Sequence, residues 1–335
     1  MKRNILVLVI GVIALIMGGC GVPLASAPTP TPAKKSGTIR MAFPTEADTG
    51  DVPALMAFEL LKDEGYTVQP TFFANPDVSV AAVAKGDVDI SHGSTRTHWA
   101  AVQKGGDIRT VMEQAADIWS LVTRPEFSKC ADLDGRRVAV NSAGSISKAL
   151  LDAYLKENCP NIKPEIVFIS GSENRATAMQ ANQIDGTLLE VADILQLDHA
   201  APGKYHSLIN YSETFPKLKT TGVQVNGAFA AQHPDMVRDY LTALLTIHRR
   251  INENPQLLRD AFVKYLSMKP EDAKEITDAY LARRVWDVNG GLKADDVKYS
   301  IDFFTQSGSL EPGLTVEQVS DLSYLNAILE QIGRK

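Results

Sequence analysis

Short apolar runs alternate with polar loops and longer helix-like segments through the first two thirds of the chain. The first such set predicts strands over residues 38–43, 68–73 and 88–90, with a helix over 54–64 between the first two. Strands that alternate with helices are typical of parallel pairing, because a parallel neighbour is reached only by a crossover connection. The pattern therefore predicts an α/β fold.

The same order of features occurs twice. One small-residue helix ends at Gly86 and a second ends at Asn182, and these are the residue types that most readily adopt the left-handed conformation of a helix end. Three pairs of matching positions lie 94 to 97 residues apart: Phe43 and Val140, Leu61 and Leu155, and Asp89 and Asp185. A nearly constant offset over three features indicates two lobes of similar construction.

We therefore expect each lobe to be a mainly parallel sheet flanked by helices. Residues 116–122 and 221–226 are expected to cross between the lobes as a two-strand hinge. Open parallel sheets bind ligands at the carboxyl ends of their strands, so a ligand cleft should lie between the lobes. The expected divisions are a signal peptide (1–19), a tether (20–37), a first lobe (38–120), a second lobe (121–220), and a return to the first lobe with C-terminal helices (221–335).

Beyond residue 226 the chain is expected to be helical. The predicted helices cover 234–252, 255–266, 270–284, 294–305 and 316–332, and three of them begin with Pro, which suits the first turn of a helix. We expect these helices to cover the first lobe.

Composition and charge exclude some classes of protein. The 335 residues are 44% hydrophobic and 22% charged, which is typical of a globular chain with real cores. The net charge of −6 and the absence of a Lys/Arg run interleaved with aromatics argue against nucleic-acid binding.

The N-terminus reads as an export signal. A positive start precedes an apolar run over residues 5–17, which is short for a membrane span, and Gly18-Gly19-Cys20 follows. These last residues resemble the lipobox of bacterial lipoproteins, in which the Cys is lipidated; an ordinary signal with an incidental Cys is the alternative. Residues 23–35 are rich in Thr-Pro repeats and are typical of an extended tether.

Cys130 and Cys159 are then expected outside the cytoplasm, where disulfides form. Both should lie at the edge of the second lobe opposite the cleft. A structural bridge and two free thiols are both compatible with the sequence, and no surrounding loop chemistry points to catalysis.

The lipobox, the tether and the doubled strand-loop-helix pattern with its A-x-G-x-x-D segment resemble the substrate-binding lipoproteins of ABC importers, which have the type II periplasmic-binding-protein fold. The branch resembled is related to thiamine-pyrimidine synthases and to taurine, alkanesulfonate and nitrate binders, and the resemblance covers residues 38 to about 310. It implies a monomer that is lipid-anchored at the cell membrane, faces the extracytoplasmic side and has a small-molecule ligand. Its implied partners are a permease and a cytoplasmic ATPase, with no cofactor.

Catalytic interpretations are less favoured. Ser145 and Lys148 match the S-x-x-K of serine acyl enzymes, but the S-D-N and K-T-G partners of that motif are missing and Ser145 suits a helix cap. No metal-binding motif such as H-E-x-x-H or C-x-x-C occurs. A pyrimidine-synthase-like enzyme would need a cysteine-rich metal motif, and only two Cys follow Cys20. We expect a binding protein with no catalytic or metal-ligating residue.

The expected cleft loops carry more carboxylates than cations, and unpaired carboxylates beside a buried anion are costly. A neutral or hydroxyl-rich heterocycle fits better, with riboflavin as first choice and a thiamine-pyrimidine precursor as second. Taurine, an alkanesulfonate or nitrate at a helix start near Ser147 is the alternative. The residues expected to contact ligand are Phe43, Glu46, Asp48, Ser94, Thr95, Trp119, Asn141, Ser145, Arg175 and Glu190.

Overall fold

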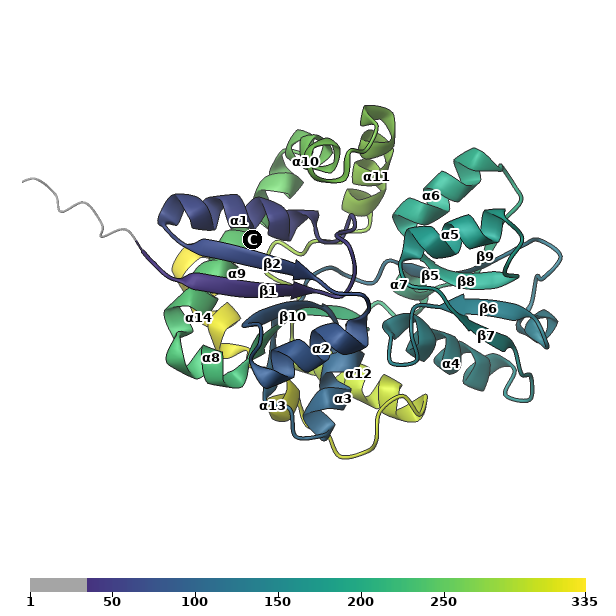
Figure 1. Ribbon diagram of the computed structural model, residues 1–335, viewed down its shortest axis with the longest axis horizontal. Coiled ribbons are helices and arrows are strands. Elements are labelled where there is room, and N and C mark those ends of the chain that lie inside the picture. Colours follow the sequence, from purple (N-terminus) through teal and green to yellow (C-terminus); the bar gives the residue numbers. More distant parts are fainter. Residues whose placement is uncertain (1–34) are drawn as a thin grey trace, which may run out of the picture. The chain divides into compact units, whose positions relative to one another are not determined.

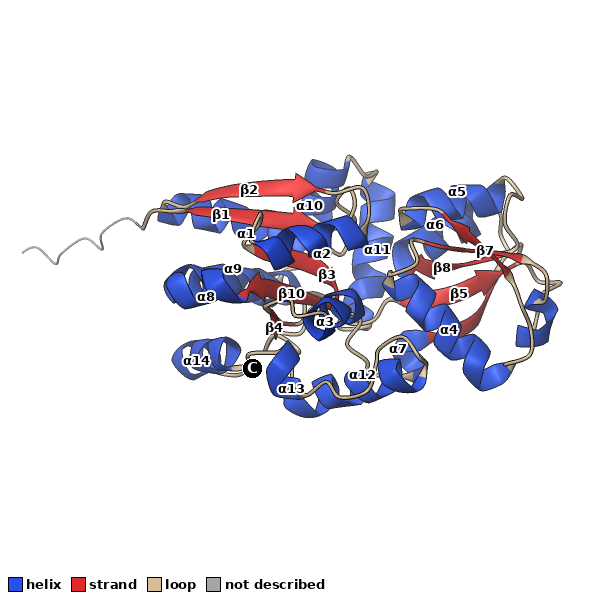
Figure 2. Cartoon of the chain, turned by 60° about the horizontal axis from the view of Figure 1, so that its bottom comes forward, coloured by secondary structure: helices blue, strands red, loops and turns tan. Residues whose placement is uncertain are grey.

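The computed structural model describes residues 35–335, so the predicted signal peptide, Cys20 and most of the tether lie outside the described residues. The described part contains two five-stranded sheets, each with helices on both faces (Figures 1 and 2). This confirms the predicted α/β fold of two similar lobes. No helix within residues 35–335 combines the length and the apolar content needed to cross a membrane.

The first sheet has the strand order β2-β1-β3-β10-β4. Strand β1 is parallel to β2 and β3, whereas β10 runs antiparallel between β3 and β4. The sheet is therefore mixed, because β10 returns from the second lobe in the opposite direction. Its strands are β1 (Thr38–Phe43), β2 (Thr67–Phe72), β3 (Ile90–Ser94), β4 (Ile108–Met112) and β10 (Thr221–Asn226), and its first helices are α1 (Val52–Glu64), α2 (Pro76–Lys85) and α3 (Thr95–Gln103).

The second sheet repeats this plan with the order β7-β6-β8-β5-β9. Strand β5 enters from the first lobe and pairs antiparallel with β8 and β9. Strand β9 was not predicted from the sequence. The strands are β5 (Trp119–Thr123), β6 (Arg137–Val140), β7 (Glu165–Phe168), β8 (Gly186–Glu190) and β9 (His206–Asn210), and the helices are η1 (Cys130–Leu133, a 3-10 helix), α4 (Ile146–Asn158), α5 (Ser172–Gln180), α6 (Val191–Ala200) and α7 (Tyr211–Thr214).

The C-terminal helices were expected to cover the first lobe, but two of them also contact the second lobe. They are α8 (Gly227–Gln232), α9 (Pro234–Glu253), α10 (Gln256–Leu266), α11 (Pro270–Ala282), α12 (Ala294–Gln306), α13 (Val316–Val319) and α14 (Ser323–Ile332). Helix α9 packs on α1, but α11 contacts α6 and α12 contacts α4 of the second lobe. The predicted helix over 316–332 is two helices, because Ser320 pairs with Thr110 and the Asp321 carboxylate accepts the Ser323 N–H at 2.9 Å, which starts a new helix.

The matching Asp residues of the two lobes make the same contact. Asp89 accepts the backbone N–H of Arg40 at 2.8 Å, and Asp185 accepts that of Arg137 at 2.9 Å. Each contact ties the strand that follows a left-handed helix end, β3 or β8, to its parallel neighbour, β1 or β6. Asn182 has a positive φ of 55° where Gly86 has 77°. The repeated sequence pattern thus encodes a repeated strand junction.

The structure corrects the strand that begins at Val88. The sequence indicated a strand over 88–90 and then a polar loop, but β3 runs to Ser94. Its polar side chains are buried because they find partners inside the lobe: His92 Nε2 bonds the Tyr240 hydroxyl, and Ser91 Oγ lies 3.1 Å from His98 Nε2. Polar residues therefore predict a loop wrongly where hydrogen bonds inside the protein take the place of water.

Two links fix the segments around the second lobe. Cys130 and Cys159 form a disulfide that joins η1 to the end of α4, with Cα atoms 6.0 Å apart. Lys219, just before β10, donates to Glu113, just after β4, at 2.9 Å, and both side chains are buried. This ion pair connects the two segments that cross between the lobes.

Candidate functional site

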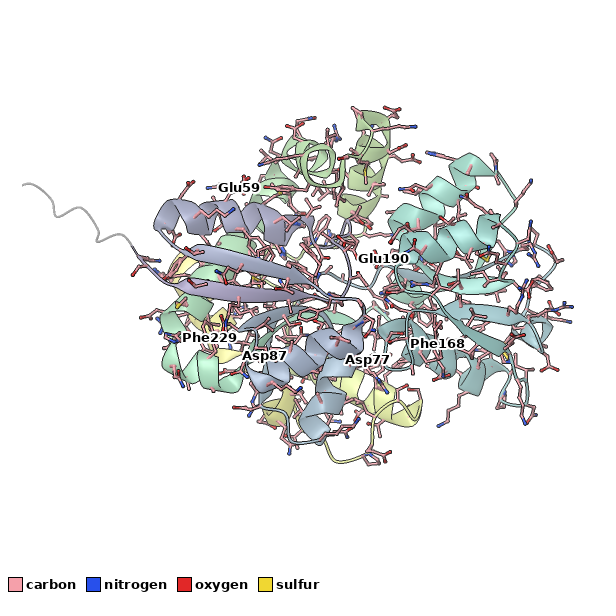
Figure 3. The ribbon with its side chains drawn as sticks, in the orientation of Figure 1. Glu59, Asp77, Asp87, Phe168, Glu190 and Phe229 are labelled. Atoms are coloured by element: carbon pink, nitrogen blue, oxygen red, sulfur yellow. A yellow bond between two sulfur atoms is a disulfide. The ribbon has the colours of Figure 1, made fainter. Side chains whose placement is uncertain are left out.

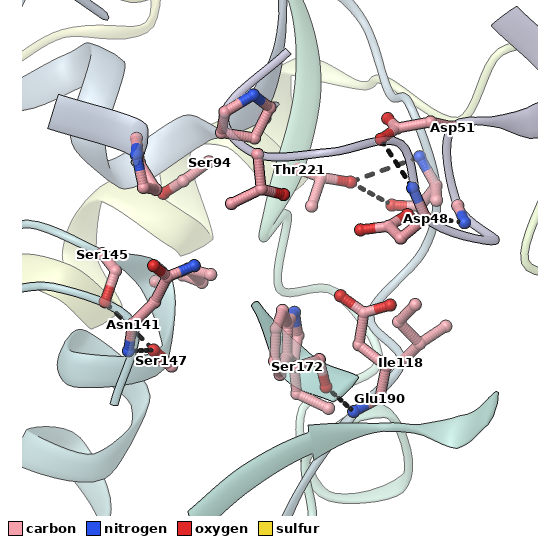
Figure 4. A pocket seen from close by; sticks show the side chains of 18 of the residues that line it. Asp48, Asp51, Ser94, Ile118, Asn141, Ser145, Ser147, Ser172, Glu190 and Thr221 are labelled. Atoms are coloured by element: carbon pink, nitrogen blue, oxygen red, sulfur yellow. Dashed lines mark hydrogen bonds between the residues drawn. The ribbon is translucent and has the colours of Figure 1, made fainter. Parts of the chain in front are cut away.

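A pocket that is partly open to solvent is lined by residues of both lobes (Figure 4). The carboxyl ends of β1 and β3 meet it from the first lobe, and those of β6 and β8 from the second, through residues such as Ser94, Asn141 and Glu190. This is the edge at which open α/β sheets bind ligands, as expected.

The structure brings six of the ten expected contact residues to this pocket and leaves four outside its lining. The lining residues are Asp48, Ser94, Trp119, Asn141, Ser145 and Glu190. Asn141 and Ser145 belong to the loop before α4, and Trp119 and Glu190 face each other on the paired strands β5 and β8.

Phe43 and Glu46 do not line the pocket. The Phe43 ring is fully buried in the core, where it stacks on Phe72 with ring centroids 5.2 Å apart and contacts Phe58 edge-on at 6.1 Å. Glu46 is exposed on the loop that follows. The expected contact of Phe43 with a ligand is therefore corrected, because its ring is buried inside the lobe.

Thr95 and Arg175 act behind the pocket instead of within it. The Thr95 hydroxyl donates to the backbone carbonyls of Lys219 and Thr220. The buried Arg175 donates to the carbonyls of Leu188, Ile169 and Gly171 at 3.1, 3.2 and 2.9 Å. Its guanidinium also lies 5.7 Å from the centre of the Trp119 ring, so it holds one wall of the pocket in place.

Gln114 is a lining residue that the sequence did not reveal. It follows β4 in the segment that crosses to the second lobe, and its amide donates to the Asp51 carboxylate at 2.7 Å. No local motif marks this position, since only the crossing of the chain brings it beside the loop after β1. Ser147 and Ser172 complete the wall of the second lobe.

The lining is strongly acidic. Asp48, Asp51, Glu173 and Glu190 contribute carboxyl groups, and the lining residues include no Lys, Arg or His. Burial, and then Asp193 and Glu173, raise the pKa of Asp48 to about 6. Burial, and then Asp48 and Asp193, raise the pKa of Glu190 well above its usual value. Such a pocket disfavours further negative charge.

Several buried polar atoms at the pocket have no hydrogen-bond partner among residues 35–335. These are Gln114 Oε1, Trp119 Nε1 and Asn141 Oδ1. Buried polar groups are normally paired, so these atoms offer two acceptors and one donor to a ligand. Within the same residues, no group of three His, Cys, Asp or Glu side chains is arranged to hold a metal ion.

Residues 59–257 match a protein family described as NMT1/THI5 like. The chain belongs to this family. No curated protein matches this NMT1/THI5-like chain.

Solved structures with the same fold include a nitrate-binding protein, an alkanesulfonate-binding protein and the ligand-binding component of an ABC-type import system. The nitrate-binding protein of Synechocystis PCC 6803 is 11% identical, with a TM-score of 0.72 over 88% of this chain and 89% of its own. The alkanesulfonate-binding protein of Xanthomonas axonopodis is 17% identical, with a TM-score of 0.66 over 84% and 97%. The ligand-binding component of an ABC-type import system from Staphylococcus aureus is 14% identical, with a TM-score of 0.69 over 86% and 98%. At these identities the likeness establishes the shared fold of this NMT1/THI5-like protein.

Three hydrogen bonds between the lobes close the rim of the pocket, and we call them the rim contacts. Ser142 Oγ donates to the Asp77 carboxylate at 2.7 Å, and Ser170 Oγ donates to the carbonyl of Ala74 at 2.9 Å. Thr97 Oγ1 donates to the carbonyl of Gly144 at 2.7 Å. Each joins the start of a helix or a strand end in one lobe to a loop of the other.

Ser145 occupies a capping position in this NMT1/THI5-like protein. Its hydroxyl accepts the Lys148 backbone N–H at 3.3 Å and donates to the Ser142 carbonyl at 2.7 Å. The Lys148 ammonium is paired with Asp152. Both side chains of the S-x-x-K match are thus engaged in structural contacts.

Proposed function

We propose that this protein is an extracytoplasmic solute-binding receptor that captures a small molecule and delivers it to an ABC importer. The observation that carries the proposal is a pocket built jointly by two lobes, with buried polar atoms of Gln114, Trp119 and Asn141 that lack partners within the described residues. The fold shared with nitrate-binding, alkanesulfonate-binding and ABC-import proteins supports it.

The proposed setting follows from the export signal. Lipidation at Cys20 would hold a monomeric receptor at the extracytoplasmic face of the cell membrane, and the Thr-Pro tether would give it reach to a permease and its ATPase.

The proposed ligand is a planar, vitamin-like heterocycle with hydrogen-bond donors. Carboxyl groups of Asp48 and Glu190 accept hydrogen bonds, and Trp119 presents a ring that is buried by all but 7% of its surface. Riboflavin offers ring and chain donors, and a thiamine-type pyrimidine offers amino groups. A ring contact with Trp119 contributes about 0.5 to 1.5 kcal/mol beyond area burial.

An anion is the competing ligand class, because two of the similar structures are nitrate- and alkanesulfonate-binding proteins. Placing an anion beside Asp48, Asp51 and Glu190 would bring like charges together in a site of low dielectric, which costs several kcal/mol. The acidic lining therefore favours the heterocycle.

A thermal-shift panel tests the proposal with riboflavin, a thiamine-type pyrimidine, taurine, an alkanesulfonate and nitrate. A ligand present at about a hundred times its Kd adds about 2.7 kcal/mol of stability, which is readily measured. We expect a shift with a heterocycle and quenching of Trp fluorescence, with the ligand recovered unchanged.

Trp119→Phe is the matched variant for the quenching signal. Trp99 and Trp286 are 1% exposed and do not line the pocket, so we expect the variant to keep their fluorescence and lose the quenching. A shift with taurine, the alkanesulfonate or nitrate alone would overturn the heterocycle assignment. Chemical conversion of the added compound would overturn the assignment as a binder.

A further inference from the structure

Carboxyl groups from the two lobes oppose each other across the pocket. Asp48 and Asp51 belong to the loop after β1, whereas Glu190 ends β8 and Asp193 lies in the first turn of α6. In Figure 4 the carboxyl groups of Asp48 and Glu190 point into the space between them. Bringing the lobes together therefore brings negative charges together.

Glu190 is the central member of this group. Its side chain is 7% exposed and lines the pocket, and within residues 35–335 its carboxyl group makes no hydrogen bond, since only its backbone N–H bonds Ser172. A buried carboxylate without a partner is costly. This position is thus prepared for a donor that the protein itself does not supply.

Most of the ionisable groups around Glu190 are carboxyl groups. Asp48 and Asp51 face it from the first lobe, Asp193 and Glu173 from its own lobe, and Tyr280 from α11. The nearby cation is Arg175, whose Nε and Nη1 donate to three backbone carbonyls and whose Nη2 has no partner within residues 35–335. His92 lies 3.9 Å from Asp51, but burial lowers the pKa of His92 to about 3, so it is neutral at ordinary pH.

A second observation also points to a ligand with N–H groups. Gln114 is 8% exposed, lines the pocket beside Asp51, and has no partner for its Oε1 within the described residues. A donor-bearing ring that reaches Glu190 and this amide oxygen would satisfy both.

We propose that the transported solute carries a positive charge on a nitrogen-containing ring, and that Glu190 is the residue that selects it. Because Asp48 and Glu190 belong to different lobes, their repulsion opposes closure until a cation lies between them. This inference rests on the proposed receptor function and names its substrate class. Between the two vitamin candidates it favours the pyrimidine, whose ring can be protonated, over neutral riboflavin.

The first test needs no ligand. Folded-state pKa values of about 6 for Asp48 and Asp193 lie above the ordinary Asp value, so protons bind the closed state more tightly and closure gains as pH falls. Small-angle scattering of the empty protein should give a smaller radius of gyration at about pH 5 than at about pH 8, across the raised pKa values.

Glu190→Gln removes one opposing charge with little change of shape. We expect it to be the more compact form already at about pH 8, with far-UV circular dichroism confirming that it is folded. Glu165→Gln is the matched control, because Glu165 is an exposed carboxylate at the start of β7 in the same lobe. The inference would be overturned if the radius of gyration of the wild type did not change with pH, or if Glu190→Gln gave the same radius of gyration as the wild type at each pH.

The second test uses the aminopyrimidine of thiamine as the probe that can be protonated and riboflavin as the probe that stays neutral. Glu190→Gln should weaken aminopyrimidine binding by about tenfold or more while leaving riboflavin binding unchanged. Equal losses for both probes would overturn the charge role of Glu190, and binding of Mg²⁺ or Ca²⁺ in place of either probe would overturn the organic-cation class. Failure of every compound in the thermal-shift panel would instead count against the receptor function, since the scattering result does not depend on a ligand.

Discussion

At the scale of single residues, the two Asp side chains that follow the left-handed helix ends are the clearest link between sequence and structure. Asp89 accepts the Arg40 backbone N–H and also the Arg40 guanidinium, and Asp185 accepts the Arg137 backbone N–H and the Arg124 guanidinium. Asp89 is only 2% exposed, so its loss would leave a backbone donor of β1 without its partner.

We expect Asp89→Ala to lower the free energy of unfolding by about 1–3 kcal/mol, the usual cost of an unsatisfied buried group. Urea denaturation measures the change. Asp87→Ala is the matched control, because Asp87 is an exposed carboxylate two residues away and its loss should change stability by less than about 0.5 kcal/mol. Equal losses for the two variants would contradict this reading of the repeat.

At the scale of elements, the rim contacts place the loop before α4 directly against the start of α2. A Cβ atom on Gly144 would lie 1.9 Å from Asp77 Oδ1 of the other lobe, so the Asp77 side chain would have to move out of its contact with Ser142. Its carbonyl also accepts Arg96 Nη1 at 3.0 Å. The close approach exists only while the lobes are together.

Gly144→Ala should therefore weaken ligand binding by about tenfold or more. It should not lower the free energy of unfolding, because Ala can adopt the ordinary φ of this position without strain. Asp77→Ala in the same chain removes the clashing carboxylate and should restore most of the affinity. Calorimetric titration of the two single variants and the double variant measures this coupling. A double variant no better than Gly144→Ala would contradict a rim contact that governs closure.

At the scale of the whole molecule, each sheet contains one antiparallel strand, β5 or β10, reached by a chain segment that crosses between the lobes. The buried Lys219–Glu113 pair ties these two crossings together. Such paired crossings are the kind of hinge that lets two rigid lobes close over a ligand.

The proposed lipid anchor also belongs to this scale. We expect Cys20→Ala to move the protein from the membrane fraction to the soluble extracytoplasmic fraction, because lipidation at this residue would hold the exported chain at the membrane. Cell fractionation with detection of the protein measures the change, and Cys130→Ala, outside the predicted lipobox, is the control. Continued membrane partitioning of Cys20→Ala would contradict lipidation.

The features that the sequence by itself determined are those with a local cause. Gly86 and Asn182 end helices because their backbones tolerate positive φ, and Ser145 begins α4 because its hydroxyl accepts a free N–H of the first turn. Repetition of such local signals at a constant offset predicts two similar α/β lobes, and the rule for open sheets places the site at their strand ends.

Only the tertiary structure decided which side chains face the pocket. The side chains of Phe43 and Arg175 point into the lobes, where they contact aromatic rings and backbone carbonyls. Gln114 reaches the pocket because the segment that crosses between the lobes brings it to the loop of Asp51. The polar segment β3 is a buried strand because the Tyr240 hydroxyl hydrogen-bonds His92 and the His98 ring hydrogen-bonds Ser91 in place of water. These outcomes depend on contacts between segments far apart in the chain, and no local pattern records such contacts.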